Sequence, residues 1–256
     1  MNEQKEKRKA LRRALIAAAS VLIWIIIWEL GALIVHNELI LPSPVTTAAR
    51  LFSLAATIGY WRAVGLSILN ISIGLICGIA LGVLGGTVCG HNSVVRALFS
   101  PILTVVRATP VASFIMLVYI WLSKNALPGF ISFLMVLPVV WTAIERGVLE
   151  RDRKLLEAAK VFSFDRKKVL RYITLPSVRP YFIESLRTSA GLAWKAGIAA
   201  EVLVVAKNTI GGMLYDAKIA LETTDVFAWT LSVIIISLVL EAIIKAVLDK
   251  KKAGEM

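Results

Sequence analysis

Six long apolar blocks constrain this chain more than any other feature of its sequence. They lie at about residues 14–36, 67–89, 101–122, 128–144, 181–206 and 226–247. A helix of about 20 apolar residues crosses a hydrocarbon layer about 30 Å thick. Hydrophobic residues make up 58% of the 256 residues, above the share of about half that soluble domains show. The sequence therefore predicts an all-α integral membrane protein with six transmembrane helices.

The distribution of positive charge predicts how these helices are oriented. Twenty of the 29 Lys and Arg residues fall in the N-terminal flank, the second loop, the central loop and the C-terminal tail, five fall in the opposite loops, and four lie inside the apolar blocks. Lys and Arg concentrate in cytoplasmic loops. We therefore expect basic cytoplasmic tails at 1–13 and 248–256, one transmembrane domain at 14–247, and a cytoplasmic loop at 147–180. This asymmetry also explains the net charge of +12 without nucleic acid.

The central loop between the fourth and fifth blocks carries two short helical patterns. The first covers Asp152–Val161 and places its apolar residues near one face. Ser163 and Asp165 are suited to start the second helix, because their side chains can accept from free N–H groups there. Pro176 and Pro180 are expected to end it, since proline cannot donate the next helical hydrogen bond. A helix–turn–helix of this size cannot bury its apolar face alone, so it must lie on another surface.

The same loop resembles the EAA loop of bacterial ABC importer permeases. The resemblance rests on Glu157-Ala158-Ala159, a turn residue at Ser163, and Ile173-x-Leu175-Pro176. In that family the loop forms a coupling helix that docks on a separate ATPase subunit. The resemblance implies that the residues contacting the ATPase subunit are Glu157, Ala158, Ala159, Ser163, Leu175 and Pro176. The family usually has glycine at the Ser163 position, and serine takes positive φ poorly, so the turn is expected to be built differently. The alternative is a basic amphipathic loop resting on lipid headgroups.

Other segments resemble the nitrate, sulfonate and taurine branch of these permeases. They are Leu41-Pro42-Ser43-Pro44, Arg107-Ala108-Thr109-Pro110, Ala193-Trp194-Lys195 with Ala200-Glu201, Gly211-Gly212 and Thr224-Asp225. The resemblance implies a multi-pass protein of the bacterial inner membrane that works as a homodimer with two ATP-binding subunits and an extracytoplasmic solute-binding protein. The branch often has a proline where this chain has Ala108. The third span, kinked at Pro110, is therefore expected to be less bent here.

The chain shows no catalytic or metal-binding pattern of its own. It lacks the G-x-x-x-x-G-K-[ST] loop that cradles nucleotide phosphates. ATP and magnesium are therefore expected on the partner ATPase, with no cofactor bound by this chain. His36 and His91 lie in loops on opposite sides, so no metal site is expected. We expect a transport subunit and not an enzyme.

The second block carries glycines at four-residue spacing. They are Gly74, Gly78, Gly82, Gly86 and Gly90. Such a stripe lets another helix backbone approach closely. Packing against a helix of the same chain and packing against a second subunit are both consistent with it.

The fifth block carries charges that a lipid-facing helix would not tolerate. Trp194 and Glu201 share a helical face with Arg187 and Gly191, and Lys195 lies beside that face. Charged groups inside a membrane normally face a bundle interior or a wet cavity. We therefore expect Trp194, Lys195, Glu201 and Arg107 to border a translocation path. The alternative is a structural role: local pairing in the fifth span, or bracing of a proline kink by Arg107.

These observations predict the membrane-spanning subunit of an ATP-driven importer. Cations inside the spans would suit a small anion such as a sulfonate, taurine or nitrate, and a vitamin or pyrimidine precursor is the alternative solute. The alternative function is a stand-alone secondary transporter or channel driven by an ion gradient. A neighbouring gene that encodes P-loop motifs would distinguish the importer from this alternative.

Overall fold

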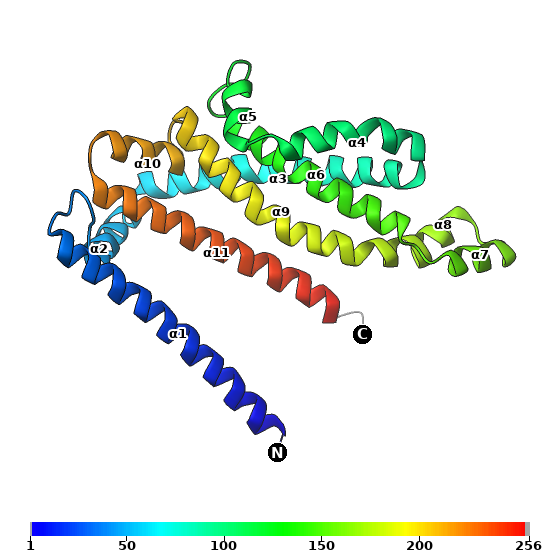
Figure 1. Ribbon diagram of the computed structural model, residues 1–256, viewed down its shortest axis with the longest axis horizontal. Helices are drawn as coiled ribbons and strands as arrows, with labels where there is room; N and C mark the ends of the chain where they lie inside the picture. Colours follow the sequence, from blue (N-terminus) through cyan, green and yellow to red (C-terminus); the bar gives the residue numbers. More distant parts are fainter. Residues whose placement is uncertain (1, 254–256) are drawn as a thin grey trace. The chain divides into compact units, whose positions relative to one another are not determined.

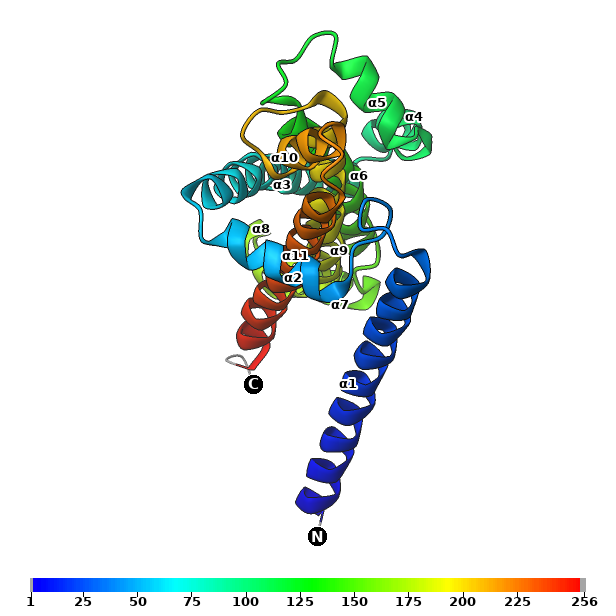
Figure 2. The same cartoon turned by 90° about the vertical axis from the view of Figure 1, so that its left-hand side faces the viewer.

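The computed structural model describes residues 2–253, and this part of the chain is helical without any strand. Its elements are α1 (Asn2–Val35), α2 (Pro44–Ala55), α3 (Ile58–His91), α4 (Ser93–Ala108), α5 (Val111–Val118), α6 (Leu127–Leu149), α7 (Arg153–Val161), α8 (Arg166–Val169), the π-helical turn η1 (Leu170–Thr174), α9 (Leu175–Val204), α10 (Ile210–Ile219) and α11 (Thr223–Ala253). Figures 1 and 2 show α1 as one uninterrupted helix. The prediction of an all-α fold is confirmed.

The helices fall into two compact units, and each is described by itself. The first unit contains the residues up to Ile58 together with Leu214–Ser232. The second contains Gly59–Met213 and the residues from Val233 onward. The second unit holds most of the chain, including the central loop and all the residues predicted to border a path.

Four helices of the described chain are long and apolar enough to cross a membrane. They are Ala18–Val35 within α1, α3, α6 and Thr223–Val247 within α11. A fifth candidate is α4 with α5, two helices bent by 101° at their junction. α9 is not among them, and it carries the charges of Glu184, Arg187, Lys195 and Glu201. The structure confirms a multi-pass helical protein with four or five candidate spans, and a sixth crossing stays a prediction.

The glycine stripe of α3 lies directly against α6. A methyl group built on Gly78 would lie 2.8 Å from the Cβ of Val136, and one on Gly82 would lie 2.8 Å from the Cβ of Val140. Non-bonded carbon atoms prefer about 3.5–4.0 Å, so even a methyl group at either position would force α6 or its valine side chain to shift. The contact continues at both ends, where Gly74 meets Gly129, Gly86 meets Ile144 and Gly90 meets Val148. The stripe therefore packs inside this chain.

The order of these contacts makes α3 and α6 parallel. From Gly78 to Gly90, each step of four residues along α3 is matched by a step of four along α6, from Val136 to Val148. Gly74 and Gly90 are separated by about 24 Å at 1.5 Å per residue. Because α6 begins beside the Gly74 end, the chain between the two helices must return along that length. α4 and α5 make this return, which supports counting them together as one crossing.

The return segment contains a break that differs from the sequence prediction. The predicted third span, Pro101–Leu122, is not one bent helix, because α4 ends at Ala108 and α5 begins at Val111. Thr109 adopts an extended conformation with ψ of 128°. A residue before proline is driven out of the helical region, and Pro110 itself donates no hydrogen bond. This single proline is enough to break the helix, so the expectation of a less bent segment is wrong.

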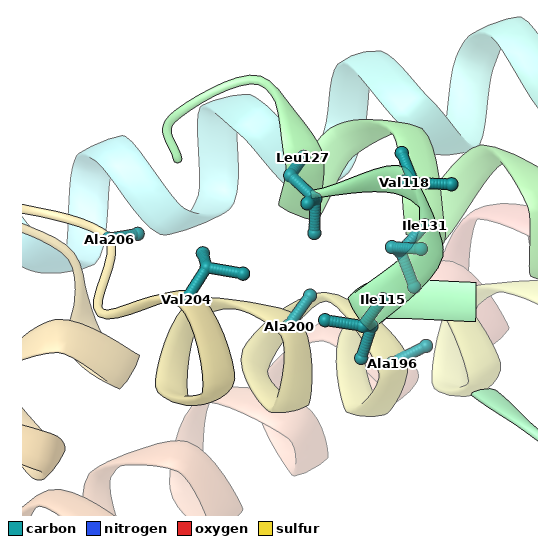
Figure 3. Packing of buried hydrophobic residues seen from close by; sticks show 8 residues of the cluster. All are labelled: Ile115, Val118, Leu127, Ile131, Ala196, Ala200, Val204 and Ala206. Atoms are coloured by element: carbon teal, nitrogen blue, oxygen red, sulfur yellow. The ribbon is translucent and has the colours of Figure 1, made fainter. Parts of the chain in front are cut away.

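α9 packs antiparallel along α6. Val178 near the start of α9 contacts Gly147 near the end of α6. Further along, the hydroxyl of Ser132 donates to the carbonyl of Ala193 at 3.0 Å. The two helices then bury a cluster with α5, in which side chains from the three helices face one another (Figure 3). Its members are Ile115, Val118, Leu127, Ile131, Ala196, Ala200, Val204 and Ala206.

The first unit is held by polar contacts at the ends of its helices. The indole of Trp28 in α1 donates to the carbonyl of Pro42 at 3.0 Å. Ser43 caps α2, since its hydroxyl accepts from the N–H of Thr46 at 3.1 Å. Arg50 and Asp225 form a two-bond pair, with Nη2 donating to Oδ2 at 2.8 Å. This hydrogen bonding to Asp225 raises the pKa of Arg50.

Candidate functional site

The first helix of the central loop ends in a tight, fully bonded turn. Asp152 caps α7, with its side chain accepting from the N–H of Lys154 at 2.8 Å. At the other end, the N–H of Phe164 donates to the carbonyl of Ala159 at 2.8 Å, and the N–H of Ser163 donates to the carbonyl of Lys160 at 3.1 Å. This pair of bonds is the Schellman pattern, which requires a left-handed residue directly after the helix.

Ser163 occupies that left-handed position with φ of 52°. The expectation that serine would change the turn is therefore wrong, because the two backbone bonds hold the conformation that glycine would adopt freely. Left-handed backbone costs a residue with a side chain about 1–2 kcal/mol. Ser163 does not cap the following helix. Asp165 does so, by accepting from the N–H of Lys168 at 2.9 Å.

The two prolines of the loop do not end its second helix, contrary to prediction. α8, the π turn η1 and α9 follow one another without a break from Arg166 to Val204. Pro176 is the second residue of α9 and comes directly after the wider π turn, which continues the helical run up to it. Pro180 lies inside α9. The central loop therefore leads directly into the fifth apolar block as one helical run.

Most of the predicted coupling residues lie on an exposed surface. Glu157, Ala158, Ser163, Leu175 and Pro176 are exposed, whereas Ala159 is buried at 4% exposure. Several large apolar side chains of the same loop are also exposed. They are Leu155, Val161, Phe162, Phe164, Leu170, Tyr172 and Leu175. The loop thus has a defined backbone and leaves much of its apolar surface uncovered in this chain.

An arginine that sequence reasoning did not select anchors the base of this loop. The Nε of Arg151 donates to the carbonyl of Val148 at 2.7 Å, and its Nη1 donates to the hydroxyl of Thr174 at 3.2 Å. The same nitrogen lies 3.2 Å from Nε2 of His91. The other ring nitrogen of His91 bonds to the carbonyl of Thr87 at 2.8 Å, so Nε2 is the acceptor. Arg151 thereby joins the ends of α3, α6 and η1.

A second polar contact joins α6 and α9 near the loop. The carboxylate of Glu150 accepts from the hydroxyl of Tyr181 and, at 2.7 Å, from Nε of Arg146. The hydrogen bond from Tyr181 is the main cause of a lowered pKa at Glu150, and the Arg146 bond adds to it. Both contacts are exposed to solvent and fix the position of α9 relative to the end of α6.

The structure separates the residues that were predicted to border a path. Trp194 is buried at 2% exposure, and its indole donates to the carbonyl of Val233 at 3.2 Å. Lys195, the next residue of α9, is exposed. Arg107 is exposed and donates from Nη2 to the carbonyl of Pro138 in α6 at 3.0 Å. Glu201 is fully buried. Their roles in a path stay predictions.

Glu201 sits in a buried polar cluster built from three helices. Its Oε2 accepts from the hydroxyl of Ser67 at 2.8 Å and from the N–H of Gly211 at 3.0 Å. The hydroxyl of Ser67 in turn accepts from the N–H of Ile210 at 2.9 Å. The remaining oxygen, Oε1, is buried without a hydrogen-bond partner among the described residues. Sequence reasoning found Glu201 and the Gly211-Gly212 pair but gave no signal for Ser67.

Close packing also explains the glycine pair beside Glu201. A methyl group on Gly211 would lie 2.3 Å from the Cβ of Glu201, and one on Gly212 would lie 2.0 Å from the carbonyl oxygen of Ala206. The turn before them contains Val205 with φ of 53°. A left-handed conformation is unusual for a β-branched residue and persists where the surroundings impose it.

Comparison with known proteins identifies the family. Residues 74–252 match the family described as "Binding-protein-dependent transport system inner membrane component". This chain belongs to that family. The taurine transport system permease protein TauC of Escherichia coli (strain K12) is 26% identical over 226 residues, covering 86% of this chain and 82% of TauC. The predicted resemblance of this chain to ABC importer permeases of the taurine and sulfonate type is thereby confirmed.

Further relatives of this permease differ in the solute that their names give. The putative aliphatic sulfonates transport permease protein SsuC of Bacillus subtilis (strain 168) is 28% identical, covering 85% of this chain and 78% of SsuC. The bicarbonate transport system permease protein CmpB of Synechococcus elongatus is 25% identical, covering 62% of this chain and 57% of CmpB. A bacterial alginate ABC transporter, solved with an alginate-bound periplasmic protein, shares the fold with a TM-score of 0.61 at 16% identity, covering 93% of both chains.

Proposed function

We propose that this chain is the membrane-spanning subunit of an ATP-driven importer and that its central loop docks on a separate ATP-binding subunit. The observation that carries the proposal is the uncovered apolar surface of the loop. Phe162 is 74% exposed and Val161 is 80% exposed, although capping and the Schellman turn fix the helix that bears them. Exposed apolar patches of this kind mark interaction sites. In this proposal ATP and magnesium are bound by the partner.

Packing supports six crossings with both termini in the cytoplasm. α9 lies antiparallel along α6, a candidate span, so it crosses the same layer despite its charges. α4 and α5 supply one further crossing, because α3 and α6 are parallel. Six crossings place the chain ends on the side of the central loop, where the basic residues concentrate. Labelling a single cysteine at position 165 from outside intact cells would contradict this topology.

The remaining parts of the proposal come from the family. The solute is a small anion, as with the taurine, sulfonate and bicarbonate named for the relatives. A solute-binding protein delivers it, as the periplasmic protein in the alginate transporter structure suggests. Two copies of this chain form the path, and the exposed Lys195 borders it. Trp194 and Glu201 would support that border from inside the chain, because they are buried.

Substitutions at Ala158 test the docking proposal. Ala158 is exposed, so Ala158→Glu should leave the loop folded and place a charge in the contact, whereas Ala158→Ser at the same position changes little. We expect the Glu variant to insert normally, lose the ATPase subunit on purification and lose uptake, with the Ser variant unaffected. Ala159 is unsuitable for this test, because it is buried within the loop. If Ala158→Glu keeps full uptake and still co-purifies with an undiminished amount of the ATPase subunit, docking at this loop is refuted.

The alternative function makes a different prediction in the same vesicles. A secondary transporter would take up solute from an ion gradient without ATP hydrolysis, and the Ala158→Glu variant would be as active as the unmodified chain. Uptake that requires ATP and stops with that variant supports the importer.

A further inference from the structure

The start of α10 is held by side chains from two other helices. The first N–H groups of a helix have no partner within it and need one from outside. Here Ser67 of α3 accepts from the N–H of Ile210 at 2.9 Å, and Glu201 of α9 accepts from the N–H of Gly211 at 3.0 Å. The next group, the N–H of Gly212, reaches the hydroxyl of Thr209 at 3.2 Å. Two of these three bonds therefore connect α10 to other helices, one to the neighbouring α9 and one to α3, which is distant in the chain.

These bonds tie the end of α9 to the start of α10. Oε2 of Glu201 also accepts from Ser67 at 2.8 Å, so one oxygen atom joins α3, α9 and α10. The backbone of Gly211 lies so close that an added methyl group would meet Glu201 at 2.3 Å. Between the two, Val205 is held with φ of 53°. A β-branched residue keeps this conformation only while its surroundings impose it.

The opposite end of the same helical run is the central loop. From Arg166 to Val204 the backbone is helical throughout, with η1 joining α8 to α9. One continuous helical run therefore connects the loop to Glu201, and Glu201 accepts from the amide of Gly211.

We propose that Glu201 is a positioning residue that couples movement of the central loop to the segment 205–212 at the far end of α9. The coupling is made by hydrogen bonds that the carboxyl oxygen accepts, and the negative charge is not required. This inference rests on the proposed function, because it takes the loop to be moved by an ATP-binding subunit. It assigns Glu201 a role within the chain, distinct from contact with the solute.

Four variants separate this role from a purely structural one. Glu201→Ala removes both acceptor bonds, whereas Glu201→Gln keeps an amide oxygen that can accept them. Glu184→Ala is the matched control, since it removes an exposed carboxylate from the same helix. Ser67→Ala, which removes one hydroxyl, repeats the test in case Glu201→Ala fails to assemble.

The experiment measures two quantities in the assembled transporter in nanodiscs. The first is amide hydrogen exchange of segment 205–212. We expect it to be at least tenfold faster in Glu201→Ala than in the unmodified protein, the Gln variant and the control. The second is maleimide labelling of Lys207→Cys, an exposed position, in a background with Cys77→Ala and Cys89→Ala. We expect Mg-ATP with vanadate to change the labelling rate in the unmodified protein, in Glu201→Gln and in Glu184→Ala. The change should be absent in Glu201→Ala and reduced in Ser67→Ala.

The outcomes distinguish the two proposals. If Mg-ATP with vanadate leaves the labelling rate of the unmodified protein unchanged, the proposed ATP-driven function fails. If the unmodified protein and Glu201→Ala respond equally, the coupling role fails and the proposed function stands. If Glu201→Gln loses the response as Glu201→Ala does, the charge is required and the hydrogen-bond mechanism is overturned.

Discussion

Single alanine substitutions along α3 should change stability according to the space beside each glycine. A methyl group on Gly74 would lie 1.9 Å from the carbonyl oxygen of Gly129, whereas one on Gly65 would meet nothing within 4 Å. Gly82 is intermediate, at 2.8 Å from the Cβ of Val140. All three positions lie in the same helix, so the change in helix propensity is the same for each and only the clearance differs.

The magnitudes follow from these distances. Replacing glycine by alanine inside a helix gains about 1 kcal/mol. Carbon and oxygen atoms in close contact stay about 3.3 Å apart, so at Gly74 the backbones of α3 and α6 must separate by roughly 1.4 Å. Overpacking costs about 1–3 kcal/mol, and a backbone carbonyl cannot turn aside as a side chain can. We expect Gly74→Ala to lose about 2 kcal/mol, Gly82→Ala to be roughly neutral and Gly65→Ala to gain about 1 kcal/mol.

Thermal unfolding of the purified chain in detergent, followed by loss of the monodisperse peak in size-exclusion chromatography, measures this order. A change of 1 kcal/mol shifts the midpoint by about 2–4 °C for a chain of this size. Gly74→Ala should therefore unfold several degrees below Gly65→Ala. Equal midpoints for these two variants would show that α3 and α6 are not in backbone contact, and the packing argument would be refuted.

Three further predictions concern the loop and the charged residues. Ser163→Gly should stabilise the turn by about 1 kcal/mol, since glycine adopts left-handed backbone without strain. Slower amide exchange at Phe164 would show this stabilisation, and an unchanged exchange rate would contradict it. Lys195→Ala should lower anion uptake per assembled complex without lowering the yield of assembled complex. Arg107→Ala should lower that yield, because the guanidinium of Arg107 bonds to α6 at 3.0 Å. The reverse pattern would make Arg107 the path residue and Lys195 the structural one. The pKa of Glu150 is lowered in the folded protein, so its contact with Tyr181 stabilises the fold fully above about pH 4.3 and is lost as the pH falls through the lower folded pKa. Amide exchange at the start of α9 should become faster in that acidic range, and Glu150→Gln should remove this pH dependence.

The sequence predicted the elements whose signal is local. Apolar blocks located α3, α6 and the membrane-spanning part of α11, and Asp152 and Asp165 marked helix starts that the structure contains. The four-residue glycine spacing indicated a close helix contact, and α6 lies along it. Each of these signals depends on residues within a few turns of one another. The motifs that indicated the family were also local, and the family match confirms the family.

Proline shows why other features could not be predicted. Its missing N–H and fixed φ are the same everywhere, yet Pro110 separates two helices, Pro176 stands in the first turn of one, and Pro138 and Pro180 lie inside helices. The outcome depends on which tertiary contacts compensate for the lost bond. Ser67 and Glu201 are likewise 134 residues apart in the chain, so no local pattern could join them.

The glycine contact between α3 and α6 also limits how this protein can move. Valine side chains of α6 occupy gaps in α3 that recur every four residues, about 6 Å along the helix axis. Sliding by less than that distance would press Val136 and Val140 against positions of α3 that carry side chains. The two helices must therefore keep their register and travel as one rigid body. Any cycle that opens this protein first to one side of the membrane and then to the other has to move its remaining helices around that fixed pair.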